Sequence, residues 1–361
     1  MSLILIALIT MLLAAANGAN DNVKGAATLI GSGIIGYRPA IALATLATAL
    51  GGVASIFLAN GLLAAFSGKG IVASELTASL PFLQAVGLGA ALTIGLGTRL
   101  GLPLSTTHAL LGGLLGAGLA ADAANVSYLA ASKAMLLPLV VSPLVAMLFA
   151  VSIVPWLRRR RAAAACVCVD VEPELVPEST ALAFASTTIT FGTPSQAECQ
   201  PAPGRTARVI SASTWLDRSH LFSAAAVSFA RGLNDTPKIA ALLFAAGTVG
   251  VGNATLLVIV PMALGGWLAS RRVADTLAFR VTRMDASEGL GGNLVTAALV
   301  VIASRFGMPV STTHVSTGAL FGIALENRGG HWLVIRNILL AWLGTLPLAA
   351  VLAYLAHLFI S

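Results

Sequence analysis

The sequence predicts an all-α membrane protein of about ten membrane segments, arranged as two inverted-topology repeats with broken helices. The 361 residues are 57% hydrophobic and only 10% charged, whereas soluble domains carry roughly 25% charged residues. The apolar stretches number about ten and run roughly 17–25 residues, the length that spans a bilayer as a helix. Two polar motifs also recur in the same order in both halves of the chain.

The first half contains five predicted membrane segments. They lie at about residues 3–35, 39–63, 76–98, 105–121 and 128–157. A short polar stretch, residues 18–25 (GANDNVKG), interrupts the first of them. Charged side chains inside a membrane-length apolar run are costly, so this stretch is predicted to be part of a functional site.

A change in composition separates the two halves. Four arginines at residues 158–161 end the fifth segment, and the residues that follow mix Pro, Ser, Thr, Glu and Arg without a period. This composition favours a linker over a second soluble domain. The predicted organisation is membrane repeat 1 (residues 1–157), a cytoplasmic linker loop (158–219) and membrane repeat 2, inverted (220–361).

The second half repeats the first. Its segments are predicted at about residues 220–246, 254–269, 286–304, 311–325 and 332–359. Residues 232–238 (GLNDTPK) repeat the first motif, and residues 307–314 (GMPVSTTH) repeat residues 101–108 (GLPLSTTH). Because each half has an odd number of segments, the second copy should enter the membrane from the opposite side, which is typical of secondary transporters.

Basic residues predict how the chain is oriented. With the N-terminus outside, the inner connections would hold Arg38, Arg99, Arg158 to Arg161, Arg271, Arg272, Arg280, Arg283 and Arg328, and the outer ones Lys69, Lys133 and Arg305. Cytoplasmic connections attract Lys and Arg, so we expect a multi-pass cell-membrane protein with both termini outside and the linker in the cytoplasm. The same sorting explains the net charge of +7 without a nucleic-acid partner.

The Asn-Asp motifs are predicted to bind cations. The proposed ligands are Asn20, Asp21, Asn234 and Asp235. Gly18 and Pro237 would break the two helices, and freed carbonyl oxygens would complete an oxygen cage for a hard cation. The alternative is a buried ion pair between Asp21 and Lys24, one turn away.

The two Ser-Thr-Thr-His motifs are predicted to bind an anion. The candidate ligands are Ser105, Thr106, Thr107, Ser311, Thr312 and Thr313. Each motif follows a Gly-x-Pro-x break, so its hydroxyls would lie at a helix N-terminus with free N–H groups, which favours anions. The alternative is that these hydroxyls only bond to the preceding carbonyls of their own helix.

Cation cages beside anion-binding helix ends predict symport in outline. Carboxylates tolerate a phosphate or sulfate only if a cation intervenes or if they are protonated. A sulfate or other oxyanion permease therefore remains an alternative. A membrane sensor or scaffold acting through the linker is a further alternative, although a scaffold has no need of duplicated intramembrane acids.

The sequence lacks both a nucleophile–base set and a Gly-x-x-x-x-Gly-Lys-[Ser/Thr] motif, so neither an enzyme nor a directly ATP-driven pump is expected.

Four motifs together resemble the inorganic phosphate transporter (PiT) family. The resemblance rests on GANDNVKG, GLND and both Pro-x-Ser-Thr-Thr-His motifs, and it covers both halves without the linker. It implies a cation-coupled phosphate symporter in the lipid bilayer, with co-transported Na⁺ or H⁺ and no other cofactor. It further implies that Asp21 and Asp235 are Na⁺ ligands if the coupling ion is sodium. A homodimer follows from the resemblance alone.

Two pairs of residues depart from the family pattern. Lys24 and Lys238 stand where small or amide residues are usual, and Thr48 and Asn293 stand where some members have membrane glutamates. We expect Lys24 and Lys238 to compensate charge, either as a substitute for a bound cation or as a phosphate contact. Arg231, beside the second motif, is either a phosphate contact or an interfacial anchor.

Overall fold

The computed structural model describes residues 2–162, 167–171, 187–191, 206–210, 212–247 and 249–361. The first half consists of α1 (Ser2–Asp21), α2 (Lys24–Gly31), α3 (Tyr37–Leu58), α4 (Asn60–Ala65), α5 (Leu80–Arg99), α6 (Thr106–Asp122), α7 (Tyr128–Ala131) and α8 (Leu137–Ala162). The second half consists of α9 (Ala212–Ala245), α10 (Val251–Ala269), α11 (Arg271–Asp275), α12 (Ala286–Arg305), α13 (Thr312–Glu326) and α14 (Trp332–Ile360). Short 3₁₀ turns lie at Leu76–Ala78 and Ala123–Asn125, and π-helical turns at Ser132–Leu136 and Thr276–Arg280.

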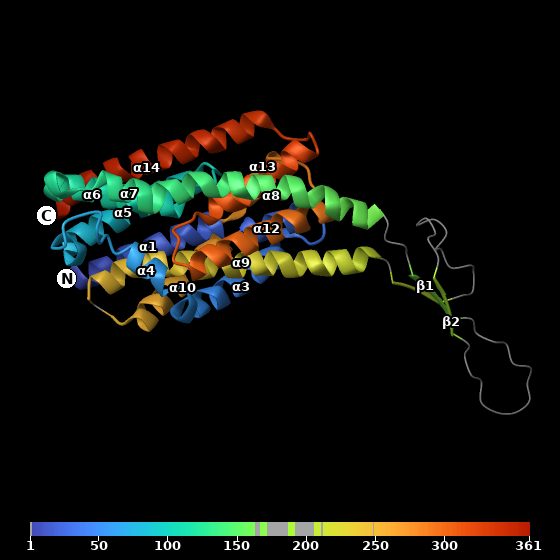
Figure 1. Ribbon diagram of the computed structural model, residues 1–361. Helices are drawn as coiled ribbons and strands as arrows, with labels where there is room; N and C mark the ends of the chain where they lie inside the picture. The colour runs from blue at the N-terminus through green and yellow to red at the C-terminus, as the bar shows by residue number, and fades with distance from the viewer. Residues whose placement is uncertain (1, 163–166, 172–186, 192–205, 211, 248) are drawn as a thin grey trace, which may run out of the picture.

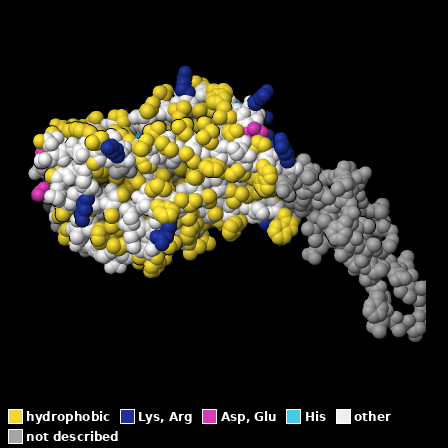
Figure 2. All heavy atoms as spheres, in the orientation of Figure 1, with side chains coloured by type: hydrophobic (Ala, Val, Ile, Leu, Met, Phe, Trp, Pro, Cys, Tyr) yellow, Lys and Arg dark blue, Asp and Glu magenta, His cyan; other side chains and the backbone are white. Residues whose placement is uncertain are grey.

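These helices form a bundle with an apolar exterior, as expected of a multi-pass membrane protein. Seven helical stretches of the described chain are long and apolar enough to cross a membrane. They are Ser2–Gly31, Tyr37–Leu58, Leu80–Arg99, Leu137–Arg159, Val251–Ala269, Ala286–Arg305 and Trp332–Ile360. The other three predicted segments correspond to α6 and α13, which have 17 and 15 residues, and to α9, which carries Arg231, Asp235 and Lys238. Ten spans therefore remain a prediction. Figure 2 shows hydrophobic side chains over much of the visible face of the bundle.

The predicted helix break at Pro237 is wrong. Helix α9 runs without interruption from Ala212 to Ala245 with Pro237 inside it. A proline removes one backbone donor, which a membrane helix tolerates when neighbouring helices support it, and α9 packs on α3, α12 and α2. The break in the first motif is slight, because α1 and α2 are separated only by Asn22 and Val23 and the bonds Asn22 N–H to Gly18 O and Ala27 N–H to Val23 O bridge that turn.

The glycines that open the two Asn-Asp motifs allow close helix packing instead. A Cβ on Gly18 would lie 1.9 Å from the carbonyl oxygen of Met262 in α10, and a Cβ on Gly232 would lie 2.0 Å from that of Thr48 in α3. Small residues let membrane helices approach to backbone contact. The two motif helices are therefore each held directly against a helix of the other half.

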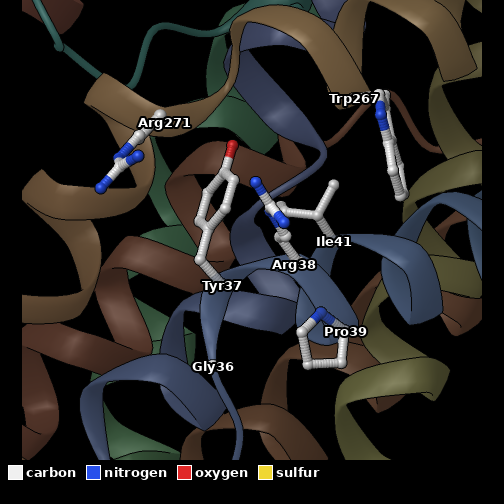
Figure 3. A pocket seen from close by; sticks show the side chains of 7 residues that line it. All are labelled: Gly36, Tyr37, Arg38, Pro39, Ile41, Trp267 and Arg271. Carbon is white, nitrogen blue, oxygen red and sulfur yellow. The ribbon is translucent and has the colours of Figure 1, made fainter.

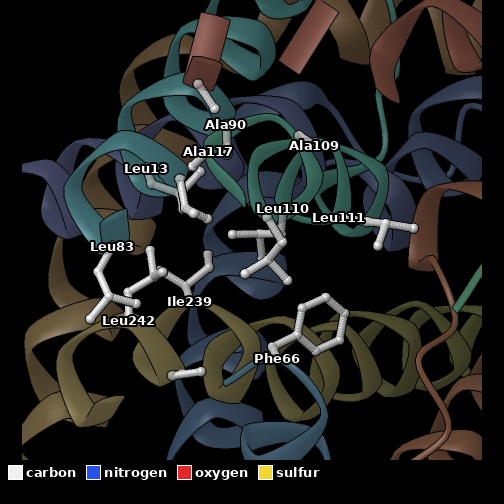
Figure 4. Packing of buried hydrophobic residues seen from close by; sticks show 14 of the residues in the cluster. Leu13, Phe66, Leu83, Ala90, Ala109, Leu110, Leu111, Ala117, Ile239 and Leu242 are labelled. Carbon is white, nitrogen blue, oxygen red and sulfur yellow. The ribbon is translucent and has the colours of Figure 1, made fainter. Parts of the chain in front are cut away.

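Helices from the two halves exchange partners throughout the bundle. α1 packs on α10 and α9 on α3, while α6 packs on α14 and α13 on α8. Buried apolar side chains of α1, α5, α6 and α9 form a core, in which Leu110, Ile239 and Phe66 lie close together (Figure 4). Both chain termini lie at one end of the bundle, and α8 and α9 leave its opposite end toward the linker (Figure 1).

The linker contains a small antiparallel sheet. Its strands are β1 (Val167–Val171), β2 (Thr187–Phe191) and β3 (Thr206–Ile210), in the order β2-β1-β3 with Val169 opposite Ile189 and Arg208. The composition of this region predicted a linker or loop, and these short strands are an addition to that prediction. Helices α8 and α9 also extend into the predicted linker, to Ala162 and from Ala212. The strands are rich in Val, Ile and Thr, the β-branched residues that are enriched in β-strands.

Candidate functional site

The two predicted acids meet in a buried polar centre. Asp21 ends α1 and Asp235 lies within α9, and both are about as buried as the apolar core, at 1% and 2% exposure. Asn17, one turn before Asp21, connects them: its Nδ2 lies 3.0 Å from Asp21 Oδ2 and 3.5 Å from Asp235 Oδ2. Sequence reasoning missed Asn17, although its spacing of four residues places it on the same helix face as Asp21.

Lys24 forms the buried ion pair with Asp21 that was the alternative to a cation site. Its Nζ lies 2.7 Å from Asp21 Oδ1. The same ammonium donates to Thr313 Oγ1 at 2.6 Å and to Thr312 Oγ1 at 3.1 Å. Three N–H donors thus meet three oxygens, one from its own half and two from the other.

Lys238 is placed equivalently in the second half. Its Nζ donates to Thr107 Oγ1 at 2.9 Å and to the Val310 carbonyl at 2.6 Å, and lies 3.5 Å from Asp235 Oδ1. Each lysine therefore joins the acid of its own half to a threonine hydroxyl of the opposite half.

The Ser-Thr-Thr-His motifs begin helices, as predicted. Ser105 and Ser311 are the N-caps of α6 and α13, and their Oγ atoms accept from the backbone N–H of His108 and His314. Side-chain oxygens at this position satisfy donors that a helix start leaves free. The motifs thus place the following threonines at the first turn of each helix.

The four threonines point into the centre and not back along their own helices. Thr312 donates to Asp235 Oδ2 at 3.2 Å, and Thr106 lies 3.5 Å from Asp21 Oδ2. Thr107 donates to the Val310 carbonyl at 3.3 Å. Thr313 donates to the Leu104 carbonyl at 2.6 Å. These last two bonds cross between the halves, so the alternative of bonding only within the own helix does not describe them.

The amides of the Asn-Asp motifs brace the turns that precede α6 and α13. Asn20 donates to Thr98 Oγ1 and the Leu102 carbonyl, each at 3.0 Å, and accepts from the Leu104 N–H. Asn234 accepts from Ser304 Oγ at 3.2 Å and donates to the Val310 carbonyl at 3.3 Å. Both amides thereby position the helix starts against the acids, and their oxygens are already in use as acceptors.

Arg231 belongs to the buried centre and is not an interfacial anchor. Its side chain is 1% exposed, and its Nε lies 3.7 Å from Asp235 Oδ2. The Nη atoms donate to Asn17 Oδ1 at 2.6 Å and to Asn22 Oδ1 at 3.2 Å. Thr48, one of the two positions where some family members have a membrane glutamate, accepts from the same guanidinium at 3.3 Å.

The remaining candidates lie around this centre. Asn293 donates to Thr28 Oγ1 at 2.9 Å in a neighbouring polar cluster with His220. The ring centres of His108 and His314 lie 4.6 Å apart, and that of His314 lies 3.9 Å from the Trp342 ring, tilted by 32°. The histidines thus form a packed layer behind the threonines.

A separate cavity of about 520 Å³ lies at the ends of α3 and α10 (Figure 3). Its lining includes Tyr37, Arg38, Trp267 and Arg271, and the Arg271 guanidinium lies 5.7 Å from the Tyr37 ring centre. Arg38, Trp267 and Arg271 are exposed. Tryptophan and arginine of this kind are typical of a membrane interface, and this cavity shares no residue with the buried centre.

Chemically, the centre combines two carboxylates, three cationic groups and two helix N-termini. The described atoms of the acids, lysines and threonines bond mainly to one another and are closed off from solvent. Helix starts and cationic side chains favour an anion. Movement of the halves relative to each other would be needed to admit one.

Comparisons with known proteins agree with this chemistry. A model of the phosphate transporter family matches residues 17–353. A Mycobacterium leprae protein named "Probable low-affinity inorganic phosphate transporter" is 28% identical over 95% of this chain and 75% of its own length. A protein of the same name from Mycobacterium bovis is 29% identical over 92% of this chain and 71% of its own length.

A solved structure titled "The sodium-dependent phosphate transporter" has the same fold. It superposes with a TM-score of 0.77 at 22% identity, over 99% of this chain and 98% of that one. The family is one of transporters and not an enzyme class. With the family model matching nearly the whole chain, the protein belongs to the phosphate transporter family.

Proposed function

We propose that this protein imports inorganic phosphate across the cell membrane as a secondary active symporter, coupled to a gradient of Na⁺ or H⁺. The observation that carries the proposal is the buried centre in which Asp21 and Asp235 meet the threonine-bearing starts of α6 and α13. Phosphate is a tetrahedral anion that accepts hydrogen bonds from hydroxyls, cationic side chains and free helix N–H groups.

We further propose that the two halves are inverted-topology repeats with ten membrane segments. The exchanged pairs support this, because α1 with α10 mirrors α9 with α3, and α6 with α14 mirrors α13 with α8. The arrangement is that of transporters whose substrate site lies at the repeat interface. Alternating access would then involve the interface that the lysines and threonines bridge.

The direct test of the function is uptake of labelled phosphate by proteoliposomes containing the full chain. An inward gradient of Na⁺, of H⁺ or of both is imposed in separate arms, and labelled sulfate replaces phosphate in a parallel series. Phosphate accumulation driven by either gradient supports the proposal. Faster uptake of sulfate than of phosphate identifies an oxyanion permease, and no gradient-driven uptake of either anion refutes symport.

The threonine hydroxyls give a prediction for affinity. We expect Thr107→Val and Thr313→Val each to weaken the apparent affinity for phosphate roughly 10–100-fold, because a hydrogen bond to a charged group is worth about 1.5–3 kcal/mol. The control is Thr93→Val in α5, where a buried threonine donates to the Gly89 carbonyl of its own helix. Equal affinities for Thr107→Val and Thr93→Val would contradict a role of this hydroxyl in anion binding.

The proposed orientation places both termini outside and the linker in the cytoplasm. It is supported by the arginine distribution and by the position of both termini at the end of the bundle opposite the linker (Figure 1). We expect a membrane-impermeant thiol reagent to leave Cys168 of β1 unlabelled on intact cells and to label it after permeabilisation. The other two cysteines, Cys166 and Cys199, lie outside the described residues but share the prediction. Labelling of these cysteines on intact cells would show that the linker faces the outside, which would contradict the proposed orientation.

A further inference from the structure

We propose that the ammonium groups of Lys24 and Lys238 occupy the two cation positions of the centre, so that neither position takes Na⁺. This inference rests on the proposed phosphate symport. Of the two coupling ions considered there, Na⁺ and H⁺, it leaves H⁺. A metal ion at either acid would need the oxygens that the lysine now holds. The residues of this chain therefore do not fit bound Na⁺ beside Asp21 or Asp235.

The surroundings of Lys24 resemble a cation site filled by the chain itself. Its Nζ is surrounded by a carboxylate oxygen at 2.7 Å and two threonine hydroxyls at 2.6 and 3.1 Å. An ammonium group has three donors and no acceptor, so these three oxygens satisfy it fully. The ammonium also lies at the N-terminus of α13, where a cation is unfavourable without a carboxylate to hold it.

The second lysine repeats this arrangement with an independent set of atoms. Lys238 Nζ meets a hydroxyl at 2.9 Å, a backbone carbonyl at 2.6 Å and a carboxylate oxygen at 3.5 Å. Carboxylate, hydroxyl and carbonyl oxygens are also the ligands that a hard cation selects. Both lysines are essentially unexposed, at 3% and 0%, so neither reaches an interface as a flexible surface lysine does.

The charge of the centre favours an anion over added metal. Lys24, Lys238 and Arg231 supply three positive charges, and Asp21 and Asp235 supply two negative ones. One positive charge therefore remains among these five buried side chains, and an unbalanced buried charge is costly. Phosphate would balance it directly, whereas Na⁺ would increase the imbalance.

The lysines also connect the halves where a bound ion would. Lys24 joins Asp21 to α13, and Lys238 joins Asp235 to the start of α6. A bound cation can contact an acid of one half and hydroxyls of the other half at the same time. Binding of such an ion is then coupled to closure of the interface between the halves. Here the bridging charge is covalently part of the chain and cannot be exchanged.

The test is saturable binding of radioactive Na⁺ to the purified full-length protein, together with phosphate uptake in the presence and absence of Na⁺. Wild type is compared with the double variants Lys24→Ala/Lys238→Ala and Lys24→Met/Lys238→Met, the second of which retains more side-chain volume. The matched control is Lys69→Ala/Lys133→Ala, which removes two exposed lysines. The Na⁺-binding measurement does not depend on transport, so it tests the lysine proposal even if the protein transports no phosphate.

We expect no saturable Na⁺ binding by wild type or the control, and uptake by both that is independent of Na⁺. The folded double variants should bind Na⁺. Addition of Na⁺ should raise their residual phosphate uptake roughly 10–100-fold, as expected for regaining an interaction with a charged group. Saturable Na⁺ binding by wild type overturns the proposal, whether or not the variants fold. Failure of a folded double variant to bind Na⁺ also overturns it, because the vacated positions would then not be cation positions.

Discussion

We expect Asp21→Asn and Asp235→Asn each to abolish gradient-driven phosphate uptake while the protein still inserts in the membrane. Each substitution leaves a buried ammonium without its carboxylate: Lys24 in one case and Lys238 in the other. Removing one partner of a buried ion pair costs about 3–5 kcal/mol, which corresponds to more than roughly 100-fold in an equilibrium constant. Uptake by proteoliposomes at matched protein content measures the loss.

A charge-balanced variant separates the functional from the structural effect. Asp21→Asn/Lys24→Met removes both charges, so we expect it to recover thermal stability in detergent but not uptake. Asp122→Asn provides the control, since this acid lies at the end of α6 and accepts a bond from the exposed Asn125. Normal uptake by a well-expressed Asp21→Asn or Asp235→Asn variant would show that the acid replaced in it is not needed for transport.

The sequence was sufficient to locate the centre because its chemistry is costly in a membrane. An Asp and a Lys inside an apolar run need partners, and the second copy of the motif made two symmetric sites the natural prediction. The Pro before each Ser-Thr-Thr-His likewise predicted helix starts, and Ser105 and Ser311 are the N-caps. Local rules with short sequence separation therefore predicted which residues gather at the buried centre, and their roles in transport stay a prediction.

What the sequence did not predict is how the halves are joined. The bonds from Lys24 to Thr313 and from Lys238 to Thr107 span 289 and 131 residues, and no local pattern reports such pairings. The same limit applies to Arg231, whose contacts with Asn17 and Thr48 decide that it is buried. The break at Pro237 was predicted from local propensity, which packing of α9 against its neighbours overrides.

The second large effect is expected at Gly232, the glycine of the second Asn-Asp motif. We expect Gly232→Val to reduce both folded yield and uptake severely. Even the Cβ would lie 2.0 Å from the Thr48 carbonyl oxygen and 2.9 Å from the Gly52 nitrogen. These are backbone atoms that no rotamer change can move, so the cost should exceed the roughly 1–3 kcal/mol of ordinary overpacking. Thermal unfolding of the detergent-solubilised protein, followed by size-exclusion chromatography, measures the change.

Gly344→Val is the matched control, because this glycine is also within a long helix, α14, but a Cβ there meets no atom within 4 Å. We expect it to remain folded and active. The effect of Gly232→Val on uptake should exceed its effect on folding, because α9 carries Arg231, Asp235 and Lys238. Moving α9 away from α3 would displace these three side chains from their partners in other helices, which are Asn17, Thr312 and Thr107 respectively. A stable, fully active Gly232→Val would mean that α3 and α9 need not touch, and that the geometry of the charged centre does not depend on their contact.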